Sequence, residues 1–192
     1  MGVFMKRFFI VFAALGILII LNSCKNNPAS STNGPVVNNL IVNPSFENNG
    51  QATLAGWDTT FNLAGFSNDT PTGGGKWSAE IITYDQRSLR PFRFGFLNQN
   101  VKVMPNIKLT YTLTFWAKLD SSISDEASLK LFQPDTTLIN YVTINNSTWT
   151  KYSIMDTASS NVIDSISVSF GIGNSYLGVG KVLVDLCSLT AK

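Results

Sequence analysis

The chain has 192 residues, enough for one domain with a sizeable hydrophobic core, and carries 14 Lys and Arg against 12 Asp and Glu. It has no histidine, which excludes Ser-His-Asp and Cys-His triads, a histidine general base and the usual zinc sites. The two positive charges in excess are matched by Lys6 and Arg7, near the start of the chain. The rest of the chain is neutral and offers no electrostatic footprint for nucleic acid.

The chain opens with a short basic segment followed by an apolar run. Lys6 and Arg7 precede residues 8–21, an unbroken apolar stretch. A helix of this stretch spans roughly 21 Å, less than the ~30 Å of a bilayer core, which favours a cleaved signal over a membrane-spanning helix. The stretch ends in Leu21-Asn22-Ser23-Cys24. This resembles the lipobox of bacterial lipoproteins, in which the cysteine is acylated and becomes the mature N-terminus. An ordinary signal peptide followed by a chance cysteine is the alternative.

We therefore expect a signal peptide over residues 1–23, a lipidated Cys24 with a tether over 24–38, and a domain over 39–192. The tether is polar and rich in Asn, Ser and Pro, so it reaches only about 20 Å as a flexible chain. The expected location is the bacterial cell envelope, lipid-anchored, in the outer rather than the inner membrane. With Cys24 acylated, Cys187 has no disulfide partner, and its apolar surroundings predict a buried core residue.

From residue 39 onward the pattern is that of short strands. β-Branched and aromatic runs are broken by Gly, Pro, Asn and Asp, and no amphipathic helix is evident. In residues 109–117, Leu, Tyr, Leu, Phe and Ala alternate with Thr and Trp, so one face is predicted to lie in the core. Further strands are expected at residues 79–85, 92–97, 128–133, 139–144, 165–172 and 181–189. These features predict an all-β, two-sheet antiparallel β-sandwich.

Five segments, in this order, resemble a known family. They are Leu40–Trp57 (LIVNPSFENNGQATLAGW), Phe96–Val101 (FLNQNV), Leu109–Lys118 (LTYTLTFWAK), Trp149–Tyr152 (WTKY) and Val182–Leu189 (VLVDLCSL). They are similar to the β-jelly-roll carbohydrate-binding modules of the group that joins families four, nine and twenty-two. The resemblance covers nearly all of residues 39–192 and implies a galactose-binding-like jelly roll. Two departures are Pro44, where glycine is common, and Asp185-Leu186, where the family has an acidic pair.

The resemblance implies a structural calcium ion and no other cofactor. In the family, the Glu of the opening motif and the first Asp of the closing pair commonly hold the ion, and these positions match Glu47 and Asp185. Calcium takes several oxygen ligands, and the loop Gly73–Lys76 can add backbone carbonyls. The alternative is that Glu47 and Asp185 are surface carboxylates or bond to loop amides.

The resemblance also implies a sugar-binding face, for which we name four residues. Trp116 lies on the polar face of its predicted strand, Tyr84 and Arg93 fall opposite the presumed core phase of theirs, and Trp77 lies in a loop. Aromatic rings stack on the apolar faces of sugars, and polar neighbours bind the hydroxyls. For each residue the alternative is a place on the convex face or the rim.

The leading interpretation is a non-catalytic module that binds a polysaccharide and is anchored to the membrane by lipid. The second is a structural or protein-interaction lipoprotein of the envelope with the same fold. A glycosidase needs two carboxylates ~5–10 Å apart, and the sequence has three glutamates with no acidic pair in a recognisable motif. We therefore expect no enzyme, and separate glycoside hydrolases as possible partners.

Overall fold

The computed structural model describes residues 38–59, 64–83, 95–103, 108–120, 125–133, 136–158, 163, 165–171 and 180–192. These residues belong to a unit that spans Val36–Lys192. The predicted signal peptide, Cys24 and all of the predicted tether except Asn38 lie outside the described residues. In the described part of the chain, no helix is long and apolar enough to cross a bilayer.

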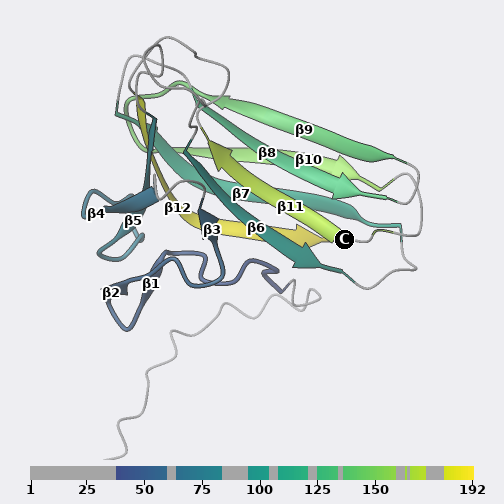
Figure 1. Cartoon of the computed structure of the whole chain (residues 1–192), viewed down its shortest axis with the longest axis horizontal. Coiled ribbons are helices and arrows are strands. Elements are labelled where there is room, and N and C mark those ends of the chain that lie inside the picture. The colour runs from purple at the N-terminus through teal and green to yellow at the C-terminus, as the bar shows by residue number, and fades with distance from the viewer. Residues whose placement is uncertain are drawn as a thin grey trace, which may run out of the picture. The chain divides into compact units, whose positions relative to one another are not determined.

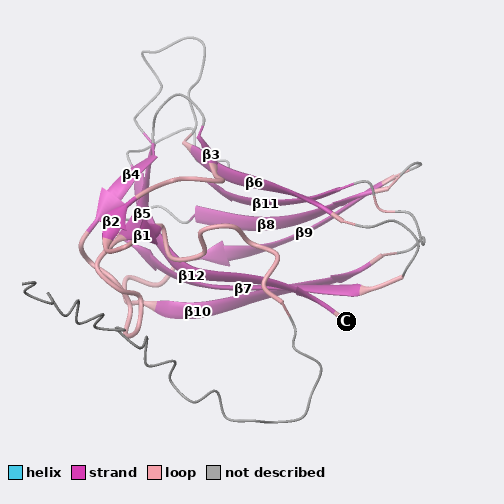
Figure 2. Cartoon of the chain, turned by 90° about the horizontal axis from the view of Figure 1, so that it is seen from below, coloured by secondary structure: helices cyan, strands magenta, loops and turns pink. Residues whose placement is uncertain are grey.

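Two five-stranded sheets face each other as two layers (Figures 1 and 2). One sheet, called here the β7 sheet, has the strand order β10 (Thr150–Thr157), β7 (Thr110–Leu119), β12 (Gly180–Ala191), β5 (Ser78–Thr83) and β4 (Ala64–Ser67). The other, called the β8 sheet, has the order β3 (Asp58–Thr59), β6 (Phe96–Lys102), β11 (Ser165–Gly171), β8 (Asp125–Phe132) and β9 (Thr137–Ile144). A separate hairpin joins β1 (Glu47–Asn48) to β2 (Gln51–Ala52). All neighbouring strands are antiparallel, which confirms the predicted sandwich.

The central strand β7 shows how the sequence places its faces. Buried and half-buried residues alternate along its whole length, and the buried set begins with Tyr111 and ends with Leu119. The opposite set consists of Thr110, Thr112, Thr114, Trp116 and Lys118. Burying the threonine face instead would leave hydroxyl groups to be satisfied inside the core. The core phase predicted for this strand is confirmed.

Aromatic rings from both sheets meet in the core. Phe115 of β7 packs edge-to-face on Phe170 of β11, with ring centroids 4.9 Å apart. Trp57 lies 5.8 Å from Phe170 and 5.2 Å from Phe46, so the segment before β3 is anchored on the same cluster. Cys187 is buried and unpaired, as predicted.

Two amide side chains attach the N-terminal segment to the sheets. Gln99 of β6 accepts a hydrogen bond from the Val42 N–H at 2.7 Å and donates one to the Val42 carbonyl at 2.9 Å. Asn39 accepts from the Leu189 N–H at 2.9 Å and donates to the Cys187 carbonyl at 3.0 Å. Gln99 is buried, and these bonds satisfy it. The segment Phe96–Val101, one of the five family-like segments in the sequence, therefore has a structural role through Gln99.

Strand β12 is interrupted by a bulge that orients an acidic side chain. Its register against β7 shifts between Asp185 and Ser188, and Leu186 has a φ of 50°. Bulges of this kind redirect the side chains beside them. Asp185 pairs with Trp116 on the outer face of the β7 sheet and is nevertheless fully buried.

Candidate functional site

A groove of about 270 Å³ crosses the outer face of the β8 sheet. Strands β6, β11, β8 and β9 all contribute to it. Its lining consists of Phe96, Glu126, Ser128, Lys130, Ile139, Tyr141, Ser169 and Gly171. The outward-pointing side chains of these strands therefore form a concave surface, and their inward-pointing side chains form part of the core.

The groove is hollow because a strand with small side chains lies between strands with large ones. On the outer face of β11, Ser169 and Gly171 are directly opposite Ser128 and Glu126 of β8. On its other side, Gly171 is opposite Phe96 of β6. The alternate residues of β11, among them Phe170, point into the core. Period-two alternation thus supplies both a packed inner face and a shallow outer floor.

Large apolar side chains stand at the edge of this groove. Ile139 and Tyr141 of β9 are 58% and 63% exposed, and they lie on the same face, two residues apart. Their exposure forgoes the roughly 1.5–3 kcal/mol that burial of such side chains provides. Neighbouring exposed apolar residues in a concave site are typical of a ligand surface. Phe96 adds a second aromatic ring at the opposite wall.

Polar groups complete the lining. Ser128 and Ser169 are directly opposite each other in the middle of the groove, where their hydroxyls can both donate and accept hydrogen bonds. Glu126 and Lys130 lie on the same face of β8, four residues apart, so a strand separates them by roughly 13 Å. Neither forms an ion pair within the described residues. Both charged groups are therefore available to a ligand.

The structure places two of the four predicted sugar-binding residues, Trp116 and Trp77, away from this groove. Trp116 is half-buried on the outer face of the other sheet, in register with Lys151 of β10 and Asp185 of β12. Trp77 is half-buried just before β5 and donates its indole N–H to the Gly50 carbonyl at 3.3 Å. Neither lines the groove. Tyr84 and Arg93 lie outside the described residues.

The sequence did not predict the groove, because the alternation in its most exposed strand, β9, does not show which face of the strand points outward. In residues 137–144, Ile139 and Tyr141 occupy one face, and Leu138, Val142 and Ile144 the other. Both faces are apolar, so alternation alone does not separate the inner one from the outer one. The polar residue inside that run, Asn140, bonds to the Met155 carbonyl of β10 at 3.1 Å. The signal that could have indicated the groove was the outward face of residues 165–171, whose small serine and glycine residues leave a hollow between neighbouring strands.

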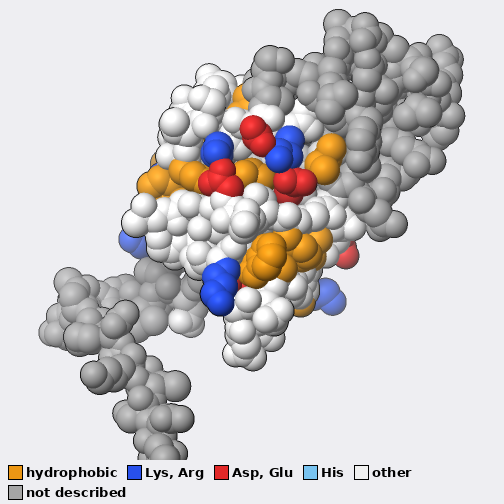
Figure 3. Space-filling model, turned by 90° about the vertical axis from the view of Figure 1, so that its left-hand side faces the viewer, with side chains coloured by type: hydrophobic (Ala, Val, Ile, Leu, Met, Phe, Trp, Pro, Cys, Tyr) orange, Lys and Arg blue, Asp and Glu red, His pale blue; other side chains and the backbone are white. Residues whose placement is uncertain are grey.

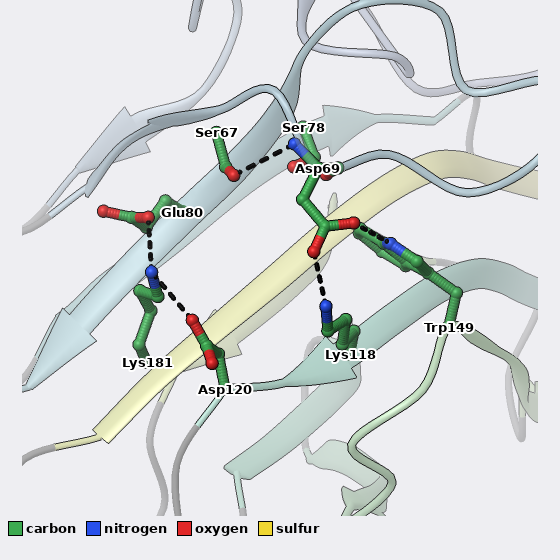
Figure 4. A network of polar contacts seen from close by, with 8 residues as sticks. All are labelled: Ser67, Asp69, Ser78, Glu80, Lys118, Asp120, Trp149 and Lys181. Atoms are coloured by element: carbon green, nitrogen blue, oxygen red, sulfur yellow. Dashed lines mark hydrogen bonds and ion pairs between the residues drawn. The ribbon is translucent and has the colours of Figure 1, made fainter.

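The charges around the end of the β7 sheet are paired with one another (Figure 4). Asp69 accepts hydrogen bonds from Lys118 and from the Trp149 indole N–H, the latter at 2.8 Å. These two bonds, that of Lys118 first, lower the pKa of Asp69. From the β4 and β5 side, acidic and basic side chains lie next to one another rather than in a patch of one sign (Figure 3). This network ties loops to strands.

A second member of this charged group is Lys181 of β12. Its ammonium group lies 2.8 Å from Asp120 and 3.2 Å from Glu80 (Figure 4). The hydrogen bond to Asp120 is the main cause that raises the pKa of Lys181. The charged groups of both networks are paired with one another, which distinguishes this surface from the groove, where Glu126 and Lys130 form no ion pair within the described residues.

Glu47 and Asp185 both face the glycine loop before β5. A Cβ on Gly74 would lie 2.2 Å from Asp185 Oδ2, and a Cβ on Gly75 would lie 1.6 Å from Glu47 Oε1. Glu47 Oε1 accepts the Lys76 N–H at 3.0 Å, and Asp185 Oδ1 accepts the Leu186 N–H at 2.7 Å. The loop can approach the two carboxylates this closely only because it has no side chains there.

One oxygen of this pair has no hydrogen-bond partner. Asp185 Oδ2 is buried and receives no donor from the described residues. Burial, and to a lesser extent the charge of Glu47, raise the pKa of Asp185 to about 7. A buried orphan oxygen beside a second carboxylate suits a hard cation with oxygen ligands. The described residues hold no third acidic, His or Cys side chain nearby, so backbone carbonyls or water would complete the ligand set.

Comparisons with known proteins bear on the fold. No family model and no curated protein matches the chain. Among solved structures, a family 16 carbohydrate-binding module matches with a TM-score of 0.60 and 18% identity, over 79% of this chain and 99% of that one. A family 61 module in complex with β-1,4-galactotriose matches at 0.54 and 12%, over 81% and 99%. The xylan-binding family 22 module of Paenibacillus barcinonensis Xyn10C matches at 0.53 and 11%, over 82% and 97%. The chain therefore has the jelly-roll fold of carbohydrate-binding modules, as its sequence motifs implied.

Proposed function

We propose that the protein is a non-catalytic glycan-binding module and that the groove of the β8 sheet holds the sugar chain. The observation that carries the proposal is one concave face that combines exposed Tyr141 and Ile139, a second aromatic ring at Phe96 and a hydroxyl-lined floor. Apolar platforms with a few convergent polar groups are what a pyranose ring requires.

The geometry favours a glycan that runs across the strands. β6 and β9 are separated by β11 and β8, so Phe96 and Tyr141 stand on strands about 14 Å apart. Between them, the serine hydroxyls of Ser128 and Ser169 can bond to sugar hydroxyls, with Glu126 as an acceptor and Lys130 as a donor towards opposite ends of the site. The similar folds support this assignment, since one was solved with a galactotriose and another is described as xylan-binding.

The lining favours binding without hydrolysis. Glu126 is the sole carboxylate among the groove residues of the described chain, and a glycosidase uses two. Any cleavage of the bound polysaccharide is therefore assigned to separate glycoside hydrolases.

The test compares two aromatic residues on opposite sheets. Tyr141→Ala should weaken binding to an immobilised polysaccharide selected by a glycan array at least tenfold, a loss of about 1.4 kcal/mol. Trp116→Ala, the matched control on the β7 sheet, should bind as wild type. Loss of binding in the Trp116 variant alone would move the site to the β7 sheet. If the folded wild-type protein bound no glycan in the array, the structural or protein-interaction alternative would replace this proposal.

We also propose that a calcium ion held by Glu47 and Asp185 stabilises the domain. The unpartnered Asp185 oxygen, its neighbour Glu47 and the bare glycine loop support this role. The pair lies on elements far apart in the sequence, β1 and β12, so an ion there would join the first strand to the last. The ion's chemistry is purely structural in this proposal.

We further propose that Cys24 carries the lipid that anchors the domain to the bacterial envelope, in the outer membrane. The support is the lipobox-like Leu21–Cys24 and the short polar tether that follows it. The tether would hold the groove close to the membrane surface, where it could retain polysaccharide for hydrolases.

A further inference from the structure

Gly171, at the end of β11, has the ring of Phe96 in the space that a side chain of its own would fill. A Cβ built on Gly171 would lie 2.1 Å from Phe96 Cδ1 and 2.5 Å from Cε1. The two residues are directly opposite each other in the β6–β11 pairing. The Phe96 ring therefore extends from its own strand over the neighbouring one and lies where a side chain of residue 171 would stand.

The backbone does not require glycine at this position. Gly171 is in a regular strand, and its φ lies outside the left-handed region. Glycine inside a strand weakens it and often marks a close approach of another group. Space for the Phe96 ring is thus the main physical reason for the missing side chain, and the Gly95 carbonyl oxygen, 3.1 Å from the same position, adds a smaller one.

The ring placement matters because of what lies beside it. On the far side of Gly171, the next residue in the sheet is Glu126 of β8, and all three residues line the groove. Because Gly171 has no side chain, the Phe96 ring lies over β11, on the side of the groove where Glu126 is the next residue. An aromatic surface and a hydrogen-bond acceptor are then adjacent, as required to hold one sugar ring by its face and by a hydroxyl.

We propose that Gly171 is a positioning residue that allows Phe96 to lie over β11 and form a sugar subsite with Glu126. The proposal rests on the glycan-binding function argued above. A methyl group at position 171 displaces the ring from the floor, and the rest of the sheet keeps its register because the backbone conformation is accessible to alanine.

The first test needs no glycan. A ring over Gly171 shifts its α-proton resonances upfield in the NMR spectrum of the purified protein, and Phe96→Leu should return them to ordinary values. Ordinary α-proton shifts in the wild type would overturn the ring placement, whatever the protein binds.

The second test is a double-mutant cycle on glycan affinity. Gly171→Ala should weaken binding about tenfold, equivalent to about 1.4 kcal/mol, and should have no further effect when Phe96 is already leucine. The matched control is Gly65→Ala in β4, where an added Cβ meets nothing within 4 Å. It should bind as wild type.

The outcomes separate the two proposals. If Gly171→Ala binds as wild type, or weakens binding equally in both backgrounds, the positioning role is wrong while the groove stands. If the wild type shows the upfield shift but binds no glycan, the proposed function fails and the ring placement remains. Thermal unfolding of each variant shows whether a loss of affinity reflects a loss of fold.

Discussion

At the residue scale, Asp185 is a buried carboxylate with one oxygen that lacks a hydrogen-bond donor among the described residues. Its Oδ1 accepts the Leu186 N–H, but Oδ2 is buried and has no donor among the residues that the structure describes. Glu47 lies close enough to raise the pKa of Asp185 further. Burial of an unsatisfied carboxylate is costly. A bound cation would remove both the unsatisfied oxygen and the repulsion.

Calcium should therefore raise the melting temperature of the wild-type protein. At a hundredfold excess over Kd the gain is about 2.7 kcal/mol, or roughly 5–10 °C for a domain of this size. Asp185→Asn should abolish the response, because it removes one charged ligand. Asp58→Asn, which changes an exposed acid on β3, should retain it. Melting curves with calcium and with a chelator decide the matter, and a wild type that responds to neither contradicts the site.

At the scale of elements, a network of polar contacts attaches a loop to strands of the β7 sheet. Asp69 follows β4 and joins Lys118 of β7 to Trp149, which precedes β10 (Figure 4). The two hydrogen bonds favour the ionised carboxylate, so the pKa of Asp69 is lower in the folded than in the unfolded protein. Protonation must weaken the network.

Asp69→Asn should destabilise the protein at pH 7 by an amount within the range of exposed ion pairs, about 0.2–1 kcal/mol. Because the folded pKa is depressed below the ordinary 3.8, this contribution is present above pH 4 and is lost as the pH falls through the folded value. Urea unfolding of wild type and variant at pH 7 and at pH 3 measures it. A difference in stability that is as large at pH 3 as at pH 7 would show that the charge of Asp69 is not the cause.

Also at the scale of elements, the two faces of strand β11 have different roles, one in the core and one in the groove. Its inner residues, such as Val168 and Phe170, are fully buried, while its outer residues are serines and a glycine. One strand therefore packs the core and lowers the floor of the site. The groove needs β11 between β6 and β8, because the larger outward side chains come from those neighbours.

At the scale of the whole molecule, the proposal joins a lipid anchor to a binding domain. Cys24→Ser should abolish incorporation of labelled palmitate, since serine lacks the acylated thiol, and should release the protein from the membrane fraction or leave the precursor unprocessed. The domain should fold as before, which melting of the purified variant checks. Palmitate that still enters the variant, or never enters the wild type, contradicts the anchor.

Much of the architecture follows from local pattern. Period-two alternation in residues 109–117 predicts the buried face of β7, because a one-residue slip would bury its threonines. The same physics predicts a sandwich from several short strands with apolar faces, and a buried Cys187 follows from its apolar surroundings. These are properties of single strands, which the sequence contains in full.

The site depended on the tertiary structure. Trp116 has the outward phase predicted for it, but its strand belongs to the sheet opposite the groove. Phe96 and Gly171 are far apart in the chain, and only the β6–β11 pairing brings the ring over the glycine. The sequence determined the face on which each side chain lies, because alternation is local. The tertiary structure decided which faces are neighbours, because strand order and register arise from contacts between distant segments.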